Sequence, residues 1–348
     1  MNPYVLATLL SSLGLGTALT FASSHWLLAW MGLEINTLAV IPLMAQHHHP
    51  RAVEATTKYF LVQATAAAVI LFASTTNAWI TGEWNMTNMS NPLATTMILA
   101  ALSLKVGLAP VHFWMPEVLQ GLDLLTGLIL STWQKLAPFA LIIQTSQAFS
   151  PLLLTALGLA SALVGGWGGL SQTQLRKILA YSSIAHMGWV IIILQHAPHL
   201  AFLALLTYIT MTSAAFLTLK LSYATKIGTL ATAWSKSPLL TATAALVLLS
   251  LGGLPPLTGF MPKWLILQEL ANQALPLTAT MMALAALISL YFYLRLCYAM
   301  TLTVSPNTTT STTPWRTQTN QISAPLALFT VTALGLLPIA PAVTALLI

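Results

Sequence analysis

Charged residues are scarce in this chain of 348 residues. They make up 5% of the sequence, whereas hydrophobic residues make up 57%. A soluble globular domain carries about 25% charged residues. So few charges could not cover the surface of a water-soluble protein of this size, so lipid must be its main solvent. The composition therefore predicts an all-α polytopic membrane protein.

Cysteine is nearly absent as well. The one cysteine, Cys297, excludes an intrachain disulfide and a cysteine-ligated metal cluster. The formal net charge of +6 would suggest a nucleic-acid partner in a soluble protein. In a membrane protein the basic residues are better explained as topology signals. We therefore expect the lipid bilayer as a partner and no nucleic acid.

Long apolar runs make up most of the sequence. Windows of about 20 apolar residues predict about eleven transmembrane helices. They lie near 3–21, 25–45, 56–80, 93–115, 122–145, 150–171, 177–195, 199–222, 237–271, 275–302 and 324–346. The connections are short and polar, and the longest runs from about Val304 to Gln321. No stretch is long enough for a soluble domain, so residues 1–348 are expected to form a single membrane domain.

The basic residues are unevenly distributed between the two sides of the membrane. With eleven spans, one side receives Arg51, Lys58, Arg176, Lys177, Lys226, Lys236 and Arg316, with Lys220 and Arg295 at helix ends facing it. The opposite side receives no lysine or arginine, and it carries Glu83 and Glu269. The positive-inside rule then predicts the amino terminus on the cytoplasm-like face and the carboxyl terminus on the other.

Four charged residues depart from this loop rule. Glu34 is central in the second span, Lys105 and Lys135 lie near the middle of the fourth and fifth, and Lys263 follows a break in the ninth. Each such charge costs about 2.5–3.5 kcal/mol in the membrane. The residues are either structural ion pairs or snorkelling side chains, or members of a hydrated path that exchange protons. Their depth favours the second explanation.

A lysine beside a glutamate suits proton transfer. Burial lowers the pKa of a lysine and raises that of a glutamate, and mutual pairing does the reverse. A lysine whose pairing can be made and broken therefore has an adjustable proton affinity. His112 and His186 are candidates to extend such a path, because an unperturbed histidine has a pKa of about 6.5. Alternatively, each histidine only hydrogen-bonds between helices.

The sequence contains an internal repeat. Segment 108–117 resembles segment 254–263, with Leu, Pro, Met and Pro matching at an offset of 146 residues. The prolines predict interrupted helices in the fourth and ninth spans. Because these spans are separated by an odd number, the repeats cross the membrane in opposite directions. We expect two inverted five-helix repeats, 1–148 and 149–303, followed by a loop and final helix in 304–348. Ion-coupled transporters commonly build midplane sites in this way.

Three motifs carry a resemblance to a known family. Segments 107–117, 174–189 and 252–264 resemble the antiporter-like membrane subunits of respiratory complex I, in their mitochondrially encoded vertebrate form. The resemblance runs over the whole of residues 1–348. It implies a location in the mitochondrial inner membrane, with the amino terminus on the matrix side and the carboxyl terminus on the intermembrane-space side.

The resemblance also implies roles for individual residues. Glu34 and Lys105 match the family's charged pair, Lys135 the central lysine that follows, and Lys263 the outer end of the relay. His112 and His186 sit in matching motifs. No cofactor is expected in this chain, so NADH, FMN, iron–sulfur clusters and ubiquinone would belong to partner subunits. The expected partners are other membrane and peripheral subunits of complex I and the bilayer, with cardiolipin as a candidate lipid.

Three functions are compatible with these features. The leading hypothesis is a proton-translocating subunit that couples electron transfer from NADH to ubiquinone elsewhere to proton pumping, so that the chain is an enzyme subunit without a redox centre. One alternative is a stand-alone cation/proton antiporter, which the same repeats and buried charges would serve. The other is a structural spacer, in which the charges only hold helices together.

Overall fold

The computed structural model describes residues 2–46, 48–235, 237–302 and 323–347. Within these ranges the chain is all-helical and contains no strand, only two isolated bridges. The predicted all-α class is therefore confirmed. The predicted loop from Val304 to Gln321, with Arg316, lies outside the described residues.

Many of the helices suit a membrane. In the described ranges seven helical segments are long and apolar enough to cross one, and a bent pair near the carboxyl end brings the number to eight. Two further apolar helices, α4 (Pro92–Val106) and α12 (Pro238–Gly252), are shorter. The chain is an integral membrane protein with several spans.

The chain forms two compact units, Met1–Leu157 and Gly158–Ile348. The helices of the first unit are α1 (Pro3–Ala22), α2 (Trp26–Met44), α3 (Pro50–Thr81), α4, α5 (Trp114–Gly121), α6 (Leu124–Ser131) and α7 (Trp133–Gln144), followed by a short 3-10 turn, η1 (Ser146–Ala148). α3 begins earlier than the predicted residue 56, because Pro50 suits the first turn and the His49 side chain accepts a hydrogen bond from the Arg51 N–H.

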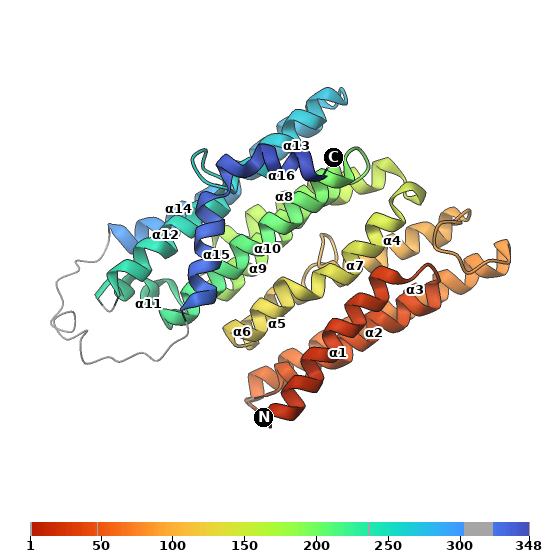
Figure 1. The fold of residues 1–348 in the computed structure, drawn as a ribbon, viewed down its shortest axis with the longest axis horizontal. Helices are drawn as coiled ribbons and strands as arrows, with labels where there is room; N and C mark the ends of the chain where they lie inside the picture. The colour runs from red at the N-terminus through yellow and green to blue at the C-terminus, as the bar shows by residue number, and fades with distance from the viewer. Residues whose placement is uncertain (1, 47, 236, 303–322, 348) are drawn as a thin grey trace. The chain divides into compact units, whose positions relative to one another are not determined.

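Small residues bring α1 and α2 together, and the two helices lie side by side in Figure 1. A Cβ atom on Gly16 would lie 2.5 Å from Asn36 Oδ1 and 2.9 Å from the Gly32 carbonyl oxygen. A Cβ atom on Gly32 would in turn lie 2.9 Å from the Gly16 carbonyl oxygen. Glycine at both positions allows the backbones to approach, as is common between membrane helices.

The second unit is built around α10 (Pro198–Leu221), which packs against α9 (Leu175–Ile193), α12 and α15 (Ala324–Gly335). The other elements are α8 (Pro151–Leu170, which begins in the first unit), α9 (Leu175–Ile193), α11 (Ile227–Ala231), η2 (Thr232–Ser235), α12, α13 (Phe260–Asn272), α14 (Pro276–Thr301), α15 (Ala324–Gly335), η5 (Leu337–Ile339) and α16 (Ala340–Leu347). The Arg295 side chain on α14 donates to the carbonyls of Leu170 and Gln172, at the end of α8.

Two helices are interrupted where the repeated motifs lie. α4 ends at Val106 and α5 begins at Trp114; α12 ends at Gly252 and α13 begins at Phe260. The residues after α4 and α12 are Gly107 and Gly253, with φ of 85° and 84°. This left-handed conformation favours glycine and ends a helix. Glycine therefore ends each first half, and the following prolines lie in or just beyond the connecting segment.

Two predicted spans are irregular. The fifth, predicted near 122–145, consists of α6 and α7, which meet at an irregular Thr132. Pro138 in the second turn of α7 lacks an N–H, and the Thr132 hydroxyl bonds to the Leu128 carbonyl at 2.7 Å, which bends helices. The final helix, expected over 324–346, bends by 62° after Gly335, where Pro338 follows. Both segments are still apolar enough to count as spans.

Candidate functional site

Lys105 lies in the last turn of α4, directly before the break. Only 6% of the residue is exposed. Its Nζ atom is buried and has no hydrogen-bond partner among the described residues. An ammonium group in this state is costly, so the position needs an explanation beyond packing.

Glu34 lies in the middle of α2, and its Oε2 atom is also buried without a hydrogen-bond partner in the described part of the chain. The carboxylate interacts electrostatically with Lys105 and with the buried Tyr59. Within the described ranges, however, Glu34 and Lys105 form no direct ion pair. The two groups that the resemblance pairs thus interact electrostatically, without a hydrogen bond from Lys105 Nζ to any described residue.

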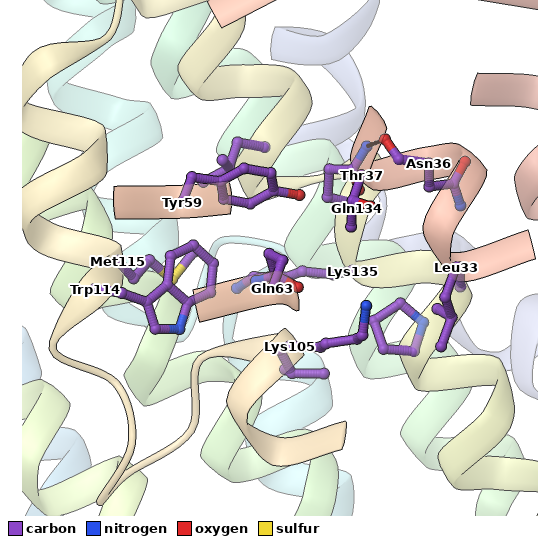
Figure 2. A pocket seen from close by; sticks show the side chains of 14 residues that line it. Leu33, Asn36, Thr37, Tyr59, Gln63, Lys105, Trp114, Met115, Gln134 and Lys135 are labelled. Carbon is purple, nitrogen blue, oxygen red and sulfur yellow. Dashed lines mark hydrogen bonds between the residues drawn. The ribbon is translucent and has the colours of Figure 1, made fainter. Parts of the chain in front are cut away.

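Lys135 lies in the first turn of α7, just after the irregular Thr132, and is 2% exposed. Lys105 and Lys135 both line one small cavity, whose water-sized free space is about 10 Å³. That is about the room that one water molecule needs. Figure 2 shows the cavity with Trp114 and Met115 on one side and Leu33 and Asn36 on the other. The fold therefore brings two of the predicted lysines to a single small polar space.

The same cavity has polar walls that sequence reasoning missed. Asn36, Tyr59, Gln63 and Gln134 line it, from α2, α3 and α7. The Gln134 side chain reaches the Asn36 carbonyl oxygen at 3.5 Å, and in the described part of the chain neither side-chain polar atom of Asn36 has a hydrogen-bond partner. Amide side chains inside apolar spans were the available signal, since they too are costly in lipid.

His112 lies in the connecting segment between α4 and α5 and is buried. Its ring centroid is 4.4 Å from that of Phe113, and its side chain hydrogen-bonds the Pro110 backbone. It belongs to the same break as Lys105 but does not line the cavity with the two lysines.

Lys263 occupies a different setting, in the second unit. It lies in the first turn of α13, is 9% exposed, and its Nζ donates to the Gly252 carbonyl oxygen at 2.8 Å. Gly252 ends α12, where carbonyls have no partner inside the helix and the helix dipole is negative. The amine thus bridges the two halves of the interrupted helix.

His186 lies on α9, which packs against α13. Its Nδ1 donates to the Ser182 carbonyl oxygen at 2.7 Å, and its ring lies against Tyr208 with centroids 5.7 Å apart. Because the Nδ1 proton is held by the backbone, Nε2 is the nitrogen able to exchange a proton.

Glu117, the glutamate of the first motif, belongs to an ion cluster at the surface. Lys58 Nζ lies 2.9 Å from Glu54 Oε1 and 2.9 Å from Glu117 Oε2. All three side chains are largely exposed, so the cluster ties α3 to α5 without burying charge. Within the described ranges no group of three histidine, cysteine or acidic residues is placed to hold a metal ion.

Solved structures with this architecture define the class of protein. A chain of respiratory complex I from Thermus thermophilus superposes with a TM-score of 0.84 and 33% identity, covering 96% of this chain and 79% of that one. A chain of the Mrp complex from Dietzia sp. DQ12-45-1b also gives 0.84, at 17% identity, covering 97% of this chain and 75% of that one. The chain, with its interrupted helices and buried lysines, thus has an antiporter-like membrane fold.

The sequence comparisons narrow this class to a family. Residues 23–289 match the family described as NADH:quinone oxidoreductase/Mrp antiporter, TM, and residues 290–344 match NADH dehydrogenase subunit 2 C-terminus. The NADH-ubiquinone oxidoreductase chain 2 of Carassius auratus is 82% identical over 343 residues, 99% of each chain. That of Danio rerio is 72% identical over 343 residues, again 99% of each. The chain belongs to the NADH-ubiquinone oxidoreductase chain 2 family.

Proposed function

We propose that this chain is a proton-translocating, antiporter-like core subunit of respiratory complex I. It serves NADH:ubiquinone reductase in the mitochondrial inner membrane and couples electron transfer in other subunits to proton pumping. Its relatives are named for that enzyme, and one solved neighbour is a chain of complex I. NADH, FMN, iron–sulfur clusters and ubiquinone are assigned to partner subunits.

One observation carries the proposal. Lys105 and Lys135 line a cavity with room for about one water molecule. A water between two amines can accept a proton from one and donate a proton to the other, which a dry apolar gap cannot do. The polar side chains around it can orient that water.

The first step we propose is a change in the Glu34–Lys105 pairing. The two groups interact through space without a bond. When they approach, the ammonium form of Lys105 is stabilised; when they separate, Lys105 releases its proton toward the cavity and Lys135. The proton then passes on to Lys263 in the second unit. His112 and His186, each beside a break or a lysine-bearing helix, extend the relay.

We further propose the inverted repeat and eleven spans. α4 and α12 each contain 15 residues, and both ends of α12 lie 146 residues after those of α4. The starts of α5 and α13 differ by the same 146 residues. Each unit also has one isolated bridge between the segments that follow two of its helices, His25 with Asn85 and Gln174 with Lys226. Two five-helix repeats and a final helix fit this correspondence.

The test is to neutralise the relay in the assembled complex. We expect Lys135→Met and Lys263→Ala to lower proton pumping in proteoliposomes by about tenfold or more, as loss of one relay member should, while the complex still contains its NADH-oxidising arm. Lys220→Met, an exposed lysine at the end of α10, is the matched control and should pump normally. Full pumping by both relay variants would reject the proposal and favour the structural spacer.

A second measurement addresses the stand-alone antiporter. The purified chain, reconstituted without other subunits, is expected to show no cation/proton exchange. Removing it from the complex should abolish coupled NADH oxidation. Exchange by the isolated chain would favour the antiporter instead.

A further inference from the structure

The carboxyl-terminal helix is bonded to both rims of the second break. The Ser250 hydroxyl, on α12, donates to the Ala333 carbonyl oxygen of α15 at 2.8 Å. The Thr258 hydroxyl, in the segment before α13, donates to the same carbonyl oxygen. Ser250, Thr258 and Ala333 are fully or almost fully buried. We call this arrangement the hydroxyl latch.

The acceptor of the latch is suited to this role. Ala333 lies in the last turn of α15, directly before the 62° bend. Carbonyls in the last turn of a helix have no N–H partner further along it, so they seek donors elsewhere. The two hydroxyl oxygens are 3.3 Å apart, so both reach one acceptor. Buried hydroxyls without partners would be costly in this setting.

The rims of the break are in contact at the latch. A Cβ atom on Gly259 would collide with the Ser250 carbonyl oxygen and would lie 3.0 Å from Met211 Sδ on α10. The connecting segment therefore folds back tightly on the end of α12. One carbonyl oxygen of α15 accepts a hydroxyl hydrogen bond from each rim, so a displacement of α15 would act on both.

Lys263 depends on the same two rims. Its acceptor, Gly252, lies two residues beyond Ser250, and α13, which carries the lysine, begins two residues beyond Thr258. The distance between Nζ and the Gly252 oxygen is thus set by how the rims are held together. A Cβ atom on Gly253 would also lie 2.9 Å from Nζ, so the amine is closely confined.

The first break lacks this device. At the offset of 146 residues, Leu104 and His112 stand where the second break has Ser250 and Thr258. The indole N–H of Trp114 instead donates to the Leu104 carbonyl oxygen at 2.9 Å. The two breaks therefore match in the bounds of their helices but differ at the two latch positions. Since the first break forms without these hydroxyls, the hydroxyls are not needed to build a break of this kind.

We propose that the hydroxyl latch positions Lys263 for proton transfer, so that Ser250 and Thr258 are positioning residues through which α15 controls this end of the relay. The inference rests on the proposed function of Lys263. A docked α15 keeps the amine on the Gly252 carbonyl, and release of the latch frees it.

The experiment compares Ser250→Ala with Thr258→Val, alone and together, in the assembled complex in proteoliposomes. We expect the double variant, which loses both hydrogen bonds to Ala333, to lower proton yield per NADH by about fivefold or more, because one hydrogen bond of ordinary strength corresponds to a factor of about five. The pH profile of pumping should move as well. Thr258→Ser, which keeps a hydroxyl at this position, should retain the yield and the pH profile of the unmodified complex. Thr241→Val on α12 is the matched control. Among the described residues, the buried Thr241 hydroxyl bonds only to the Ser237 and Pro238 carbonyls, in its own turn of helix.

The outcomes distinguish the proposed function of Lys263 from the proposed role of the hydroxyl latch. If Lys263→Ala pumps normally, the proposed function of Lys263 fails. If Lys263→Ala loses pumping but the latch variants keep both the yield and the pH profile of the unmodified complex, only the latch is overturned. Should the double variant not assemble, a structure of the Thr258→Val complex decides: an unchanged contact between Lys263 and Gly252 overturns the inference, and a broken one supports it.

Discussion

Individual lysines differ in whether they have a partner, and this difference separates lysines that stabilise the fold from those that serve function. A charge kept for stability should be paired, because pairing is what offsets its burial. Lys58 has two such partners, the carboxylates of Glu54 and Glu117. Lys105 has no hydrogen-bond partner among the described residues, although it is buried at the end of α4. Lys105 is therefore expected to destabilise the fold locally, so its presence is explained by function rather than by stability.

Lys105→Met tests this reading, since methionine is apolar and of similar length. We expect the assembled complex to be as resistant to heat as the unmodified one or more so, because an insertion cost of about 2.5–3.5 kcal/mol is removed. Proton pumping should nevertheless fall by about tenfold or more, as expected when a proton-transfer group is lost. Thermal unfolding and proton uptake are measured on the same preparation. Lower stability with normal pumping would show that Lys105 is structural.

At the scale of elements, close backbone approach decides how helices pair in the first unit. Lipid is as apolar as a leucine side chain, so membrane helices associate through close packing and polar contacts rather than through the hydrophobic effect. Gly16 and Gly32 provide that packing between α1 and α2. Since α2 also carries Glu34 and Asn36, this contact holds one wall of the lysine cavity in place.

Gly16→Ala should therefore force the two helices apart. A Cβ atom there would lie 2.5 Å from Asn36 Oδ1, so a destabilisation of about 1–3 kcal/mol is expected, as for other overpacked sites. Gly14→Ala on the same helix is the control, since nothing lies within 4 Å of its added Cβ. The midpoint of thermal unfolding of the purified complex is compared for the two variants. Equal midpoints would refute the close-packing argument.

At the scale of the whole molecule, the charge distribution carries the proposed orientation. Exposed basic residues such as Lys226 lie in loops assigned to the matrix side, and Glu83 lies in a loop assigned to the other. The native thiol, Cys297, is buried and contributes little background to labelling.

Single cysteines in these loops test the orientation. Glu83→Cys should react with a membrane-impermeant maleimide in mitoplasts, and Lys226→Cys only in inside-out inner-membrane particles, because each loop faces one aqueous compartment. Detergent-solubilised complex, in which both loops are open to reagent, is the positive control. The reverse pattern would invert the assigned topology and with it the direction of the relay.

The sequence by itself determined the class, the buried charges and the two breaks. Hydropathy, proline and charge are local properties, so they predicted an all-α membrane protein, interrupted helices at segments 108–117 and 254–263, and Lys105, Lys135 and Lys263 as residues of interest. Only the tertiary structure decided that Lys105 and Lys135 share a cavity, that Glu34 stands beside Lys105 without a bond, and that Ala333 accepts from both rims of the second break. Those facts depend on how distant helices pack and rotate about their axes, and the spacing of residues along one chain does not encode either.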